Sequence, residues 1–169
     1  MRRFWASLGS TLFFFVAPGT VAGLVPWWIT KWHLGPPFLD LSSIRWAGVG
    51  LIIAGLVPLV GSFARFAWQG LGTPAPIAPP TRLVVSGPYR YVRNPMYVAL
   101  VVILLGEALL FGDGRVFAWA GVFWLMCHVF ILVYEEPVLA RTFRADYDKY
   151  RANVPRWIPR LVPWKPPAQ

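Results

Sequence analysis

The sequence predicts an all-α integral membrane protein with about four transmembrane helices. Hydrophobic residues make up 57% of its 169 residues and charged residues only 14%, a composition that is not typical of soluble domains. The apolar residues form four long runs, near the ~20 residues that a helix needs to cross a bilayer. The spacing of these runs predicts two parts, an N-terminal transmembrane hairpin over residues 1–68 and a second unit over residues 69–169.

Charge and cysteine usage exclude several other classes of protein. The net charge is +9, but the basic residues flank apolar runs instead of covering a soluble domain. We therefore expect an anionic lipid surface or an anionic ligand, and no nucleic acid. The single cysteine, Cys127, excludes an intramolecular disulfide and a CxxC metal site. Two scattered histidines are too few for a zinc cluster, so no metal is expected.

The first two apolar runs are expected to form a hairpin. Arg2 and Arg3 precede a run over residues 4–29, which is too long for a signal peptide and is interpreted as a retained span. Pro18 should kink this span, because proline removes a helical hydrogen bond. A second span is expected over residues 44–68, and the glycines within it favour close helix packing.

The central segment, residues 69–93, is interpreted as a shaped loop. Four prolines between residues 74 and 80 prevent a helix and favour an extended path. Residues 82–86 are expected to form a short β-like piece. Because prolines dominate the segment, it is not expected to behave as a flexible tether.

The second half of the chain is expected to form another hairpin of two spans. Asn94 and Pro95 suit the N-cap and the first position of a helix over residues 94–111. The Gly-Asp-Gly sequence at residues 112–114 should form a tight turn. Residues 116–134 then return as the fourth span.

An amphipathic helix is expected after the fourth span. Basic residues occupy much of its surface, and a proline-rich tail follows it. Its apolar residues recur at spacings of four, four, three and four residues, which is the apolar stripe of a helix. The stripe consists of Leu139, Phe143, Tyr147, Tyr150 and Val154.

The distribution of basic residues predicts the orientation in the membrane. With four spans, both termini and the central loop share one side, and that side holds 13 of the 16 Lys and Arg residues. The positive-inside rule places this side, together with the amphipathic helix, in the cytoplasm. The protein is therefore expected in the cytoplasmic membrane.

Polar groups that are far apart in sequence are expected to converge on one pocket at this cytoplasmic boundary. Gly70 and Gly72, residues 90–97, and the pair Glu135 and Glu136 lie at the ends of the second, third and fourth spans. Two adjacent carboxylates at a membrane boundary are costly unless they are paired or bind a ligand. Without a ligand, both would pair with arginines, for which the candidates are Arg90, Arg93 and Arg144.

Several motifs follow one another in the second half of the chain. They are Gly87-Pro88-Tyr89-Arg90, Arg93-Asn94-Pro95-Met96-Tyr97, Tyr134-Glu135-Glu136 and the spaced pattern that runs from Phe143 to Val154-Pro155-Arg156. Together they resemble the isoprenylcysteine carboxyl methyltransferase family, and the related phospholipid methyltransferases share part of the pattern. The resemblance covers residues 70–163. It implies an integral membrane enzyme that uses S-adenosylmethionine, with residues 69–169 as its methyltransferase core and no soluble Rossmann-type domain.

The resemblance also implies where the cofactor binds. In the phospholipid branch a Gly-x-Gly turn and a Glu-Glu pair are associated with the cofactor. A carboxylate of the pair would accept the cofactor's ammonium group, an arginine would bind its carboxylate, and tyrosines would line the adenine or the sulfonium. The expected cofactor-binding residues are Gly70, Gly72, Tyr89, Arg90, Asn94, Pro95, Tyr97, Glu135 and Glu136.

The expected catalytic residues are Arg93, Asn94 and Arg144. Arg144 or Arg156, in the C-terminal segment, would orient an anionic acceptor. Members of the isoprenylcysteine family usually have Arg-His-Pro where this chain has an asparagine in the middle position. Asparagine forms hydrogen bonds but does not titrate, so an acceptor that must lose a proton would need another base.

The sequence leaves the methyl acceptor open. An isoprenylcysteine-type carboxylate, a phospholipid amine or a small lipophilic thiol would each suit a site at the lipid boundary. Membrane lipids are the expected partners, and the sequence does not predict the oligomeric state. Two other classes of protein fit the same layout. One is an NADPH-dependent membrane reductase, and the other is a non-enzymatic membrane scaffold. Binding of S-adenosylmethionine distinguishes the methyltransferase from both.

Overall fold

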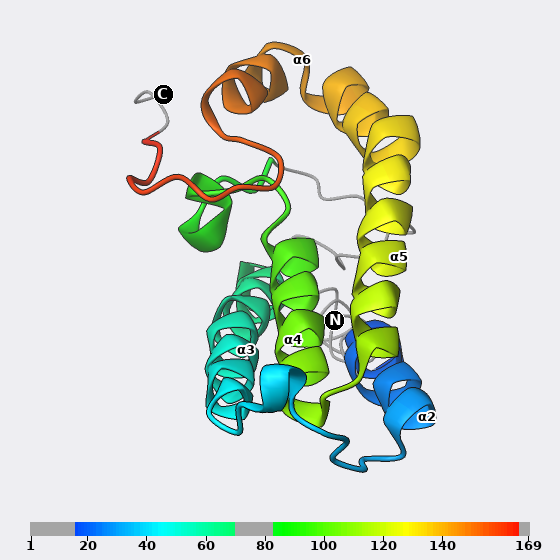
Figure 1. Ribbon diagram of the computed structural model, residues 1–169. Coiled ribbons are helices and arrows are strands. Elements are labelled where there is room, and N and C mark those ends of the chain that lie inside the picture. The colour runs from blue at the N-terminus through cyan, green and yellow to red at the C-terminus, as the bar shows by residue number, and fades with distance from the viewer. Residues whose placement is uncertain (1–15, 70–82, 166–169) are drawn as a thin grey trace.

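All the regular secondary structure is helical in the parts that the structure, a computed structural model, describes (Figure 1). These parts are residues 16–69 and 83–165, and they contain no strand, so the prediction of an all-α protein is confirmed for them. The elements are the π-helix η1 (Thr20–Leu24), α2 (Val25–Thr30), the 3-10 helix η2 (Phe38–Asp40), α3 (Ile44–Gln69), the 3-10 helix η3 (Gly87–Arg90), α4 (Pro95–Phe111), α5 (Gly114–Phe130), the π-helix η4 (Ile131–Glu135) and α6 (Glu136–Asn153).

Two helices of the described parts are long and apolar enough to cross a membrane. One comprises Ile44–Arg65 of α3, and the other is the continuous run Gly114–Asn153 that joins α5, η4 and α6. α4 is also apolar but is shorter, at 17 residues. The expected second, third and fourth spans therefore correspond to helices, while the number of four spans stays a prediction.

α3 and α4 form the most closely packed helix pair. A Cβ atom on Gly48 would lie 2.6 Å from the carbonyl oxygen of Gly106 on α4. A Cβ atom on Gly55 would lie 2.7 Å from the carbonyl oxygen of Ala99. Distances this short mean that only glycine fits at either position, because backbones that approach closely leave no room for a side chain. The close packing expected from the glycines of the second span is confirmed at Gly48 and Gly55, whereas a Cβ on Gly50 or Gly61 would meet no described atom within 4 Å.

The buried core lies between α3, α4 and the first half of α5. Leu59 of α3, Leu104 of α4 and Phe123 of α5 belong to one buried apolar cluster. The opposite faces of these helices remain apolar but exposed, as with Val57 on α3 and Leu125 on α5. A helix that is apolar on all sides is typical of a membrane span, whose outer face contacts lipid.

Two π-helical turns interrupt the long helices, and each one precedes a proline. η1 is followed by Pro26 and η4 by Pro137. Proline has no N–H, and its ring crowds the carbonyl four residues earlier. Those carbonyls belong to Ala22 and Val133, inside the two π-turns. A π-turn widens the helix at that point, which relieves the clash. η1 also follows Pro18, near which the sequence predicted a kink.

The tight turn predicted between the third and fourth spans is confirmed. Gly112 adopts a left-handed conformation with φ of 66°, and a side chain there would collide with the carbonyl oxygen of Pro36. Asp113 caps α5, because its carboxylate accepts a hydrogen bond from the backbone N–H of Arg115 at 2.9 Å. The side-chain hydrogen bond from the Arg115 guanidinium lowers the pKa of Asp113.

The amphipathic helix predicted after the fourth span corresponds to α6, but this helix is not straight. α6 breaks at Arg144, where φ is 45° and ψ is −120°, and its second half turns away from the rod formed by α5, η4 and the first half of α6 (Figure 1). The turn buries Tyr147, Tyr150 and Val154, with Leu139 packed against them. Burial of two aromatic side chains outweighs the roughly 1–3 kcal/mol that one strained residue costs. The apolar stripe was therefore identified correctly, although the helix that carries it is not straight.

The short β-like piece expected at residues 82–86 is also not found. In its described part, residues 83–86 are irregular and form no strand. Val84 is buried there, and Val85 packs against the cluster of Tyr147 and Tyr150. The β-branched residues thus reflect burial under α6, since no neighbouring strand in the described parts offers a partner for pairing.

Two glycines of α3 allow a matched pair of substitutions that tests the contact with α4, because only one of them faces α4. Gly48→Ala should destabilise the protein by about 1–3 kcal/mol, because the new methyl group overlaps the backbone of α4. Gly50→Ala meets no atom within 4 Å and should leave stability unchanged or slightly raised. Denaturant unfolding in detergent, followed by circular dichroism, measures both. Equal effects of the two substitutions would contradict the close packing.

Candidate functional site

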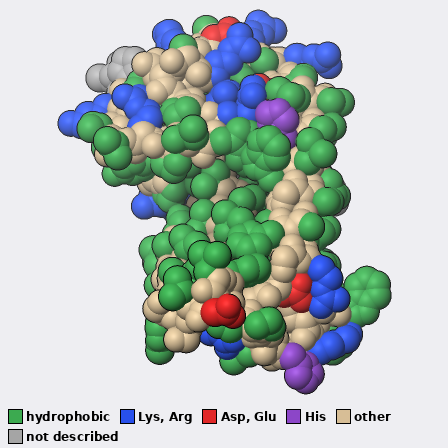
Figure 2. All heavy atoms as spheres, viewed as in Figure 1, with side chains coloured by type: hydrophobic (Ala, Val, Ile, Leu, Met, Phe, Trp, Pro, Cys, Tyr) green, Lys and Arg blue, Asp and Glu red, His purple; other side chains and the backbone are tan. Residues whose placement is uncertain are grey.

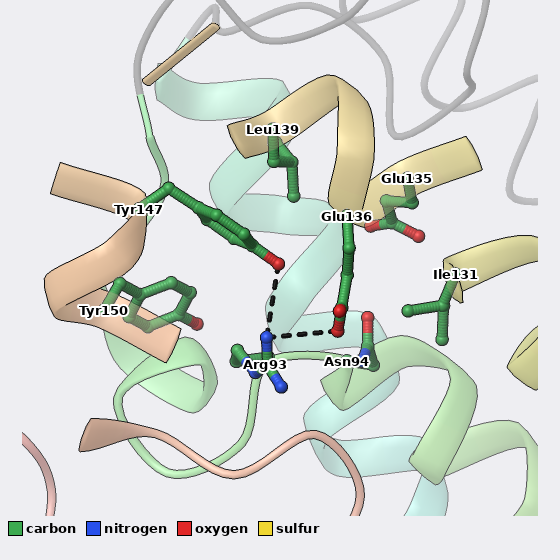
Figure 3. Close-up of a pocket in the computed structure, with 8 residues that line it drawn as sticks. All are labelled: Arg93, Asn94, Ile131, Glu135, Glu136, Leu139, Tyr147 and Tyr150. Carbon is green, nitrogen blue, oxygen red and sulfur yellow. Dashed lines mark hydrogen bonds and ion pairs between the residues drawn. The ribbon is translucent and has the colours of Figure 1, made fainter. Parts of the chain in front are cut away.

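A pocket lies where the start of α4 meets η4 and α6. Its empty space, which includes the part that is open to solvent, is about 240 Å³. The pocket is therefore too small to enclose a ligand of cofactor size, which could place only one end in it. Its side chains come from the residues before α4, from η4 and from both halves of α6 (Figure 3). The lining residues are Arg93, Asn94, Ile131, Glu135, Glu136, Leu139, Tyr147 and Tyr150.

The residues before α4 are held in place by the C-terminal tail. The backbone N–H of Arg93 donates to the carbonyl of Pro155 at 2.9 Å. The side-chain amide of Asn94 donates to the carbonyl of Arg156 at 3.1 Å. Pro95 begins α4, as predicted, and Asn94 occupies the N-cap position, but its side chain makes no capping hydrogen bond. Asn94 is thus the N-cap residue by position, but its side chain donates to the tail and does not form the expected capping hydrogen bond.

Glu136 forms the centre of a partly buried ion network. Arg156 donates to its two carboxylate oxygens, from Nε at 2.7 Å and from Nη2 at 2.9 Å, in a bidentate pair. Arg93 Nη1 lies 3.1 Å from the same carboxylate and also donates to the hydroxyl of Tyr147 at 3.2 Å. The hydrogen bond from Arg156 to Glu136 raises the pKa of Arg156. Glu136 is therefore already neutralised within the protein.

Glu135 is in a different situation from its neighbour. Its carboxylate accepts one long hydrogen bond, from the hydroxyl of Tyr97 at 3.3 Å. It forms no ion pair with any residue of the described parts. Figure 3 shows Glu136 pointing toward Arg93, whereas Glu135 leaves the helix in another direction. A carboxylate has about four acceptor sites, so Glu135 retains the capacity to bind a cationic or hydrogen-bond-donating ligand.

Arg93 carries a buried donor that has no acceptor among the described residues. Its Nη1 atom contacts Glu136 and Tyr147, but its Nε atom is buried and finds no hydrogen-bond partner in residues 16–69 and 83–165. Buried polar atoms are nearly always paired, and an unpaired one requires an explanation. Arg93 lines the pocket, so an anionic oxygen placed there would satisfy the Nε donor.

Tyrosine side chains complete one side of the site. The hydroxyl of Tyr150 donates to the carbonyl of Tyr89 at 2.7 Å. Burial, with a smaller contribution from the charge of Glu135, raises the pKa of Tyr89 well above its usual value. Its phenol is therefore neutral over the whole physiological range. Neutral aromatic rings beside a carboxylate suit a ligand with a positive charge.

The structure brings together five of the eleven expected site residues. Arg93, Asn94, Glu135 and Glu136 line one pocket, and Tyr97 contacts Glu135. These convergences agree with the geometry that the sequence predicted. The role of each residue toward a ligand stays a prediction.

Other expected residues lie elsewhere. The guanidinium of Arg90 donates to the carbonyl of Trp164 at 2.6 Å and does not line the pocket. Arg144 is exposed at the break in α6 and does not line it either. The expected Gly70 and Gly72 turn lies outside the described residues.

The alternative in which arginines neutralise both carboxylates is only partly correct. Glu136 pairs with Arg93, which was one of the three candidates. Its second partner is Arg156, which was not among them. Arg156 belongs to the motif that carries the family resemblance, and it was expected, as an alternative to Arg144, to orient an anionic acceptor. Tyr147 and Tyr150 were identified as core residues of a helix and not as part of the site.

Comparisons with known proteins agree with this arrangement. Residues 43–146 match the family described as phospholipid methyltransferase. The chain is 37% identical over 84 residues to the protein-S-isoprenylcysteine O-methyltransferase of Schizosaccharomyces pombe, covering 48% of this chain and 34% of that enzyme. It is 37% identical over 65 residues to an uncharacterized protein of Haemophilus influenzae, covering 37% of this chain and all of that protein. The chain thus spans about a third of the yeast enzyme, and no solved structure matches.

The ion network predicts strong coupling between Glu136 and Arg156. In a double-mutant cycle with Glu136→Gln and Arg156→Gln, we expect a coupling free energy of about 1.5–3 kcal/mol, because a bidentate pair of low exposure is lost. Denaturant unfolding in detergent measures it.

The exposed pair Arg151 and Asp148, at 3.0 Å, is the matched control. Their side chains are 52% and 58% exposed, so the same cycle should give about 0.2–1 kcal/mol. A coupling for Glu136 and Arg156 no larger than this would show that the network does not hold the tail on the helix.

Proposed function

The chain belongs to the phospholipid methyltransferase family, and from this premise we propose that it is a membrane methyltransferase that transfers a methyl group from S-adenosylmethionine to a lipophilic acceptor. The observation that supports this most directly is that two groups with unused hydrogen-bonding capacity line the same pocket. They are the free acceptor capacity of Glu135 and the buried, unpartnered Nε of Arg93.

These two groups fit the methionine end of the cofactor. That end carries an ammonium and a carboxylate on the same carbon atom. Glu135 would accept hydrogen bonds from the ammonium, and Arg93 Nε would donate to the carboxylate, both as charge-assisted hydrogen bonds. The pocket, with about 240 Å³ of empty space, suits one end of such a molecule. The aromatic side chains of Tyr97 and Tyr150 would lie beside it.

The remaining contribution of the protein is positioning. S-adenosylmethionine, when bound, supplies a methyl group on a positively charged sulfonium. Glu136 and Tyr147 hold Nη1 of Arg93, and this fixes the direction in which Nε points. Tyr97 holds the carboxylate of Glu135 in the same way. Preorganised contacts of this kind align two reactants and limit access of water.

The acceptor that we propose is an isoprenylcysteine-type carboxylate, the substrate class in the name of the yeast relative. Asn94 does not titrate, and its amide is engaged by the tail. A carboxylate is already deprotonated at neutral pH and needs no base, whereas a protonated amine does. A phospholipid amine or a small thiol is the alternative. Arg144 stays the proposed contact for an anionic acceptor, and the positive-inside rule supports a cytoplasmic location of the site.

Binding of S-adenosylhomocysteine tests the proposed cofactor site. We expect calorimetry in detergent to detect binding to the native protein. Glu135→Gln should weaken it about 10- to 100-fold, because one charge-assisted contact of roughly 1.5–3 kcal/mol is lost. Asp148→Asn, which removes an exposed carboxylate of α6, is the matched control and should leave the affinity unchanged.

Two results would contradict the proposal. One is no binding of S-adenosylhomocysteine to protein that is shown to be folded, together with binding of NADPH, which would identify a reductase. The other is binding of neither compound, which would favour a membrane scaffold. If the Glu135→Gln variant bound S-adenosylhomocysteine as tightly as the native protein does, the proposed activity would stand, but the cofactor would bind at another site.

A further inference from the structure

Apolar side chains of the C-terminal tail are exposed in an unusual concentration. Ile158 is 78% exposed, Leu161 98% and Val162 68%. Three large aliphatic side chains within five residues, all turned outward, form an apolar patch of the kind that marks an interaction surface. We call Trp157, Ile158, Leu161 and Val162 the tail patch.

The tail patch is held against the rest of the protein at both ends. The backbone N–H of Arg160 donates to the carbonyl of Tyr91 at 2.9 Å, and that of Trp164 donates to the carbonyl of Arg90 at 2.9 Å. The guanidinium of Arg90 returns a hydrogen bond to the carbonyl of Trp164 at 2.6 Å. The outward direction of the aliphatic side chains is thus fixed by the backbone.

A contact with α5 fixes the level along that helix at which the tail patch lies. The indole N–H of Trp157 donates to Nδ1 of His128 at 3.0 Å. Trp124 stacks on the same histidine, with ring centroids 5.1 Å apart. His128 precedes Glu135 by seven residues, which is about 10 Å along the helix at 1.5 Å per residue. The tail therefore reaches two helical turns below the carboxylates, toward the middle of α5.

The surface of α5 at this depth is itself apolar and exposed. Leu125, Met126 and Val129 are between 50% and 59% exposed, as expected for the lipid-facing side of a span. The contacts of Trp157 with His128 and Trp124 place the tail patch beside the last two turns of α5. Tryptophan is enriched at the boundary between the acyl chains and the headgroups. Basic residues also lie in and beside the patch: Arg160 lies within it, and Lys165 follows it. Figure 2 shows Lys and Arg side chains gathered at this end of the molecule.

From these observations we propose that the tail patch is a membrane anchor that lies in the headgroup and acyl boundary of the protein's own bilayer. Ile158, Leu161 and Val162 would contact acyl chains, while the basic side chains would reach anionic headgroups. The anchor is continuous with Arg156, the bidentate partner of Glu136. Contact of the tail with lipid would thus hold one wall of the ion network in place.

Depth measurement by spin labelling tests the anchor. A nitroxide at Leu161→Cys, in a Cys127→Ala background, is examined in nanodiscs of phosphatidylcholine and phosphatidylglycerol. Leu161 is 98% exposed, so the label should not disturb the fold. We expect strong relaxation by oxygen, which partitions into lipid, and weak relaxation by a water-soluble nickel chelate.

Two further positions calibrate the result. Val129→Cys on the exposed face of α5 represents the lipid phase, and Lys149→Cys on the exposed surface of α6 represents water. A label at 161 that behaves like the one at 129 supports the anchor. A label that behaves like the one at 149 overturns it. A label shielded from both reagents would also overturn it, because a protein surface and not lipid would then cover the tail.

Discussion

The ion network centred on Glu136 is the interaction on which the rest of the site depends. Its three charged residues come from the start of α4, the start of α6 and the tail, so it joins segments that are up to 63 positions apart. Two arginines on one carboxylate leave an excess positive charge. Removing any one member would leave a partly buried charge without its partner, and such losses are costly. The network therefore specifies one arrangement of the tail instead of many.

The different roles of the two adjacent carboxylates follow from helix geometry. Neighbouring residues on a helix point about 100° apart. Glu135 ends the π-turn η4 and contacts Tyr97, while Glu136 begins α6 and contacts the arginines. Pro137 directly after them disfavours a regular helix at this point. One carboxylate thus maintains the structure, and the other remains free for the ligand that we propose.

The sequence predicted those features that depend on local chemistry or on the membrane. The apolar runs placed α3, α4 and α5 within a few residues, and the Gly-Asp-Gly turn was identified from its residue types alone. The break at Arg144 was not predictable in this way, because it results from burial of Tyr147 and Tyr150 against residues far away in sequence. The contacts of Asn94 and Arg156 were not predictable for the same reason. The amide of Asn94 donates to the tail, and Arg156 lies near Glu136 only once the tail has folded back.

The length of α4 has a consequence for the bilayer around it. Its 17 residues rise about 26 Å at 1.5 Å each, a few ångströms less than the ~30 Å of an average hydrocarbon core. A span that is too short for its bilayer is accommodated by local thinning of the lipid. Thinning next to α4 brings the headgroup layer closer to the start of that helix, where Arg93 and Asn94 lie. The thickness of the bilayer, as well as the charge of its lipids, would then influence how close the boundary between water and lipid lies to the pocket.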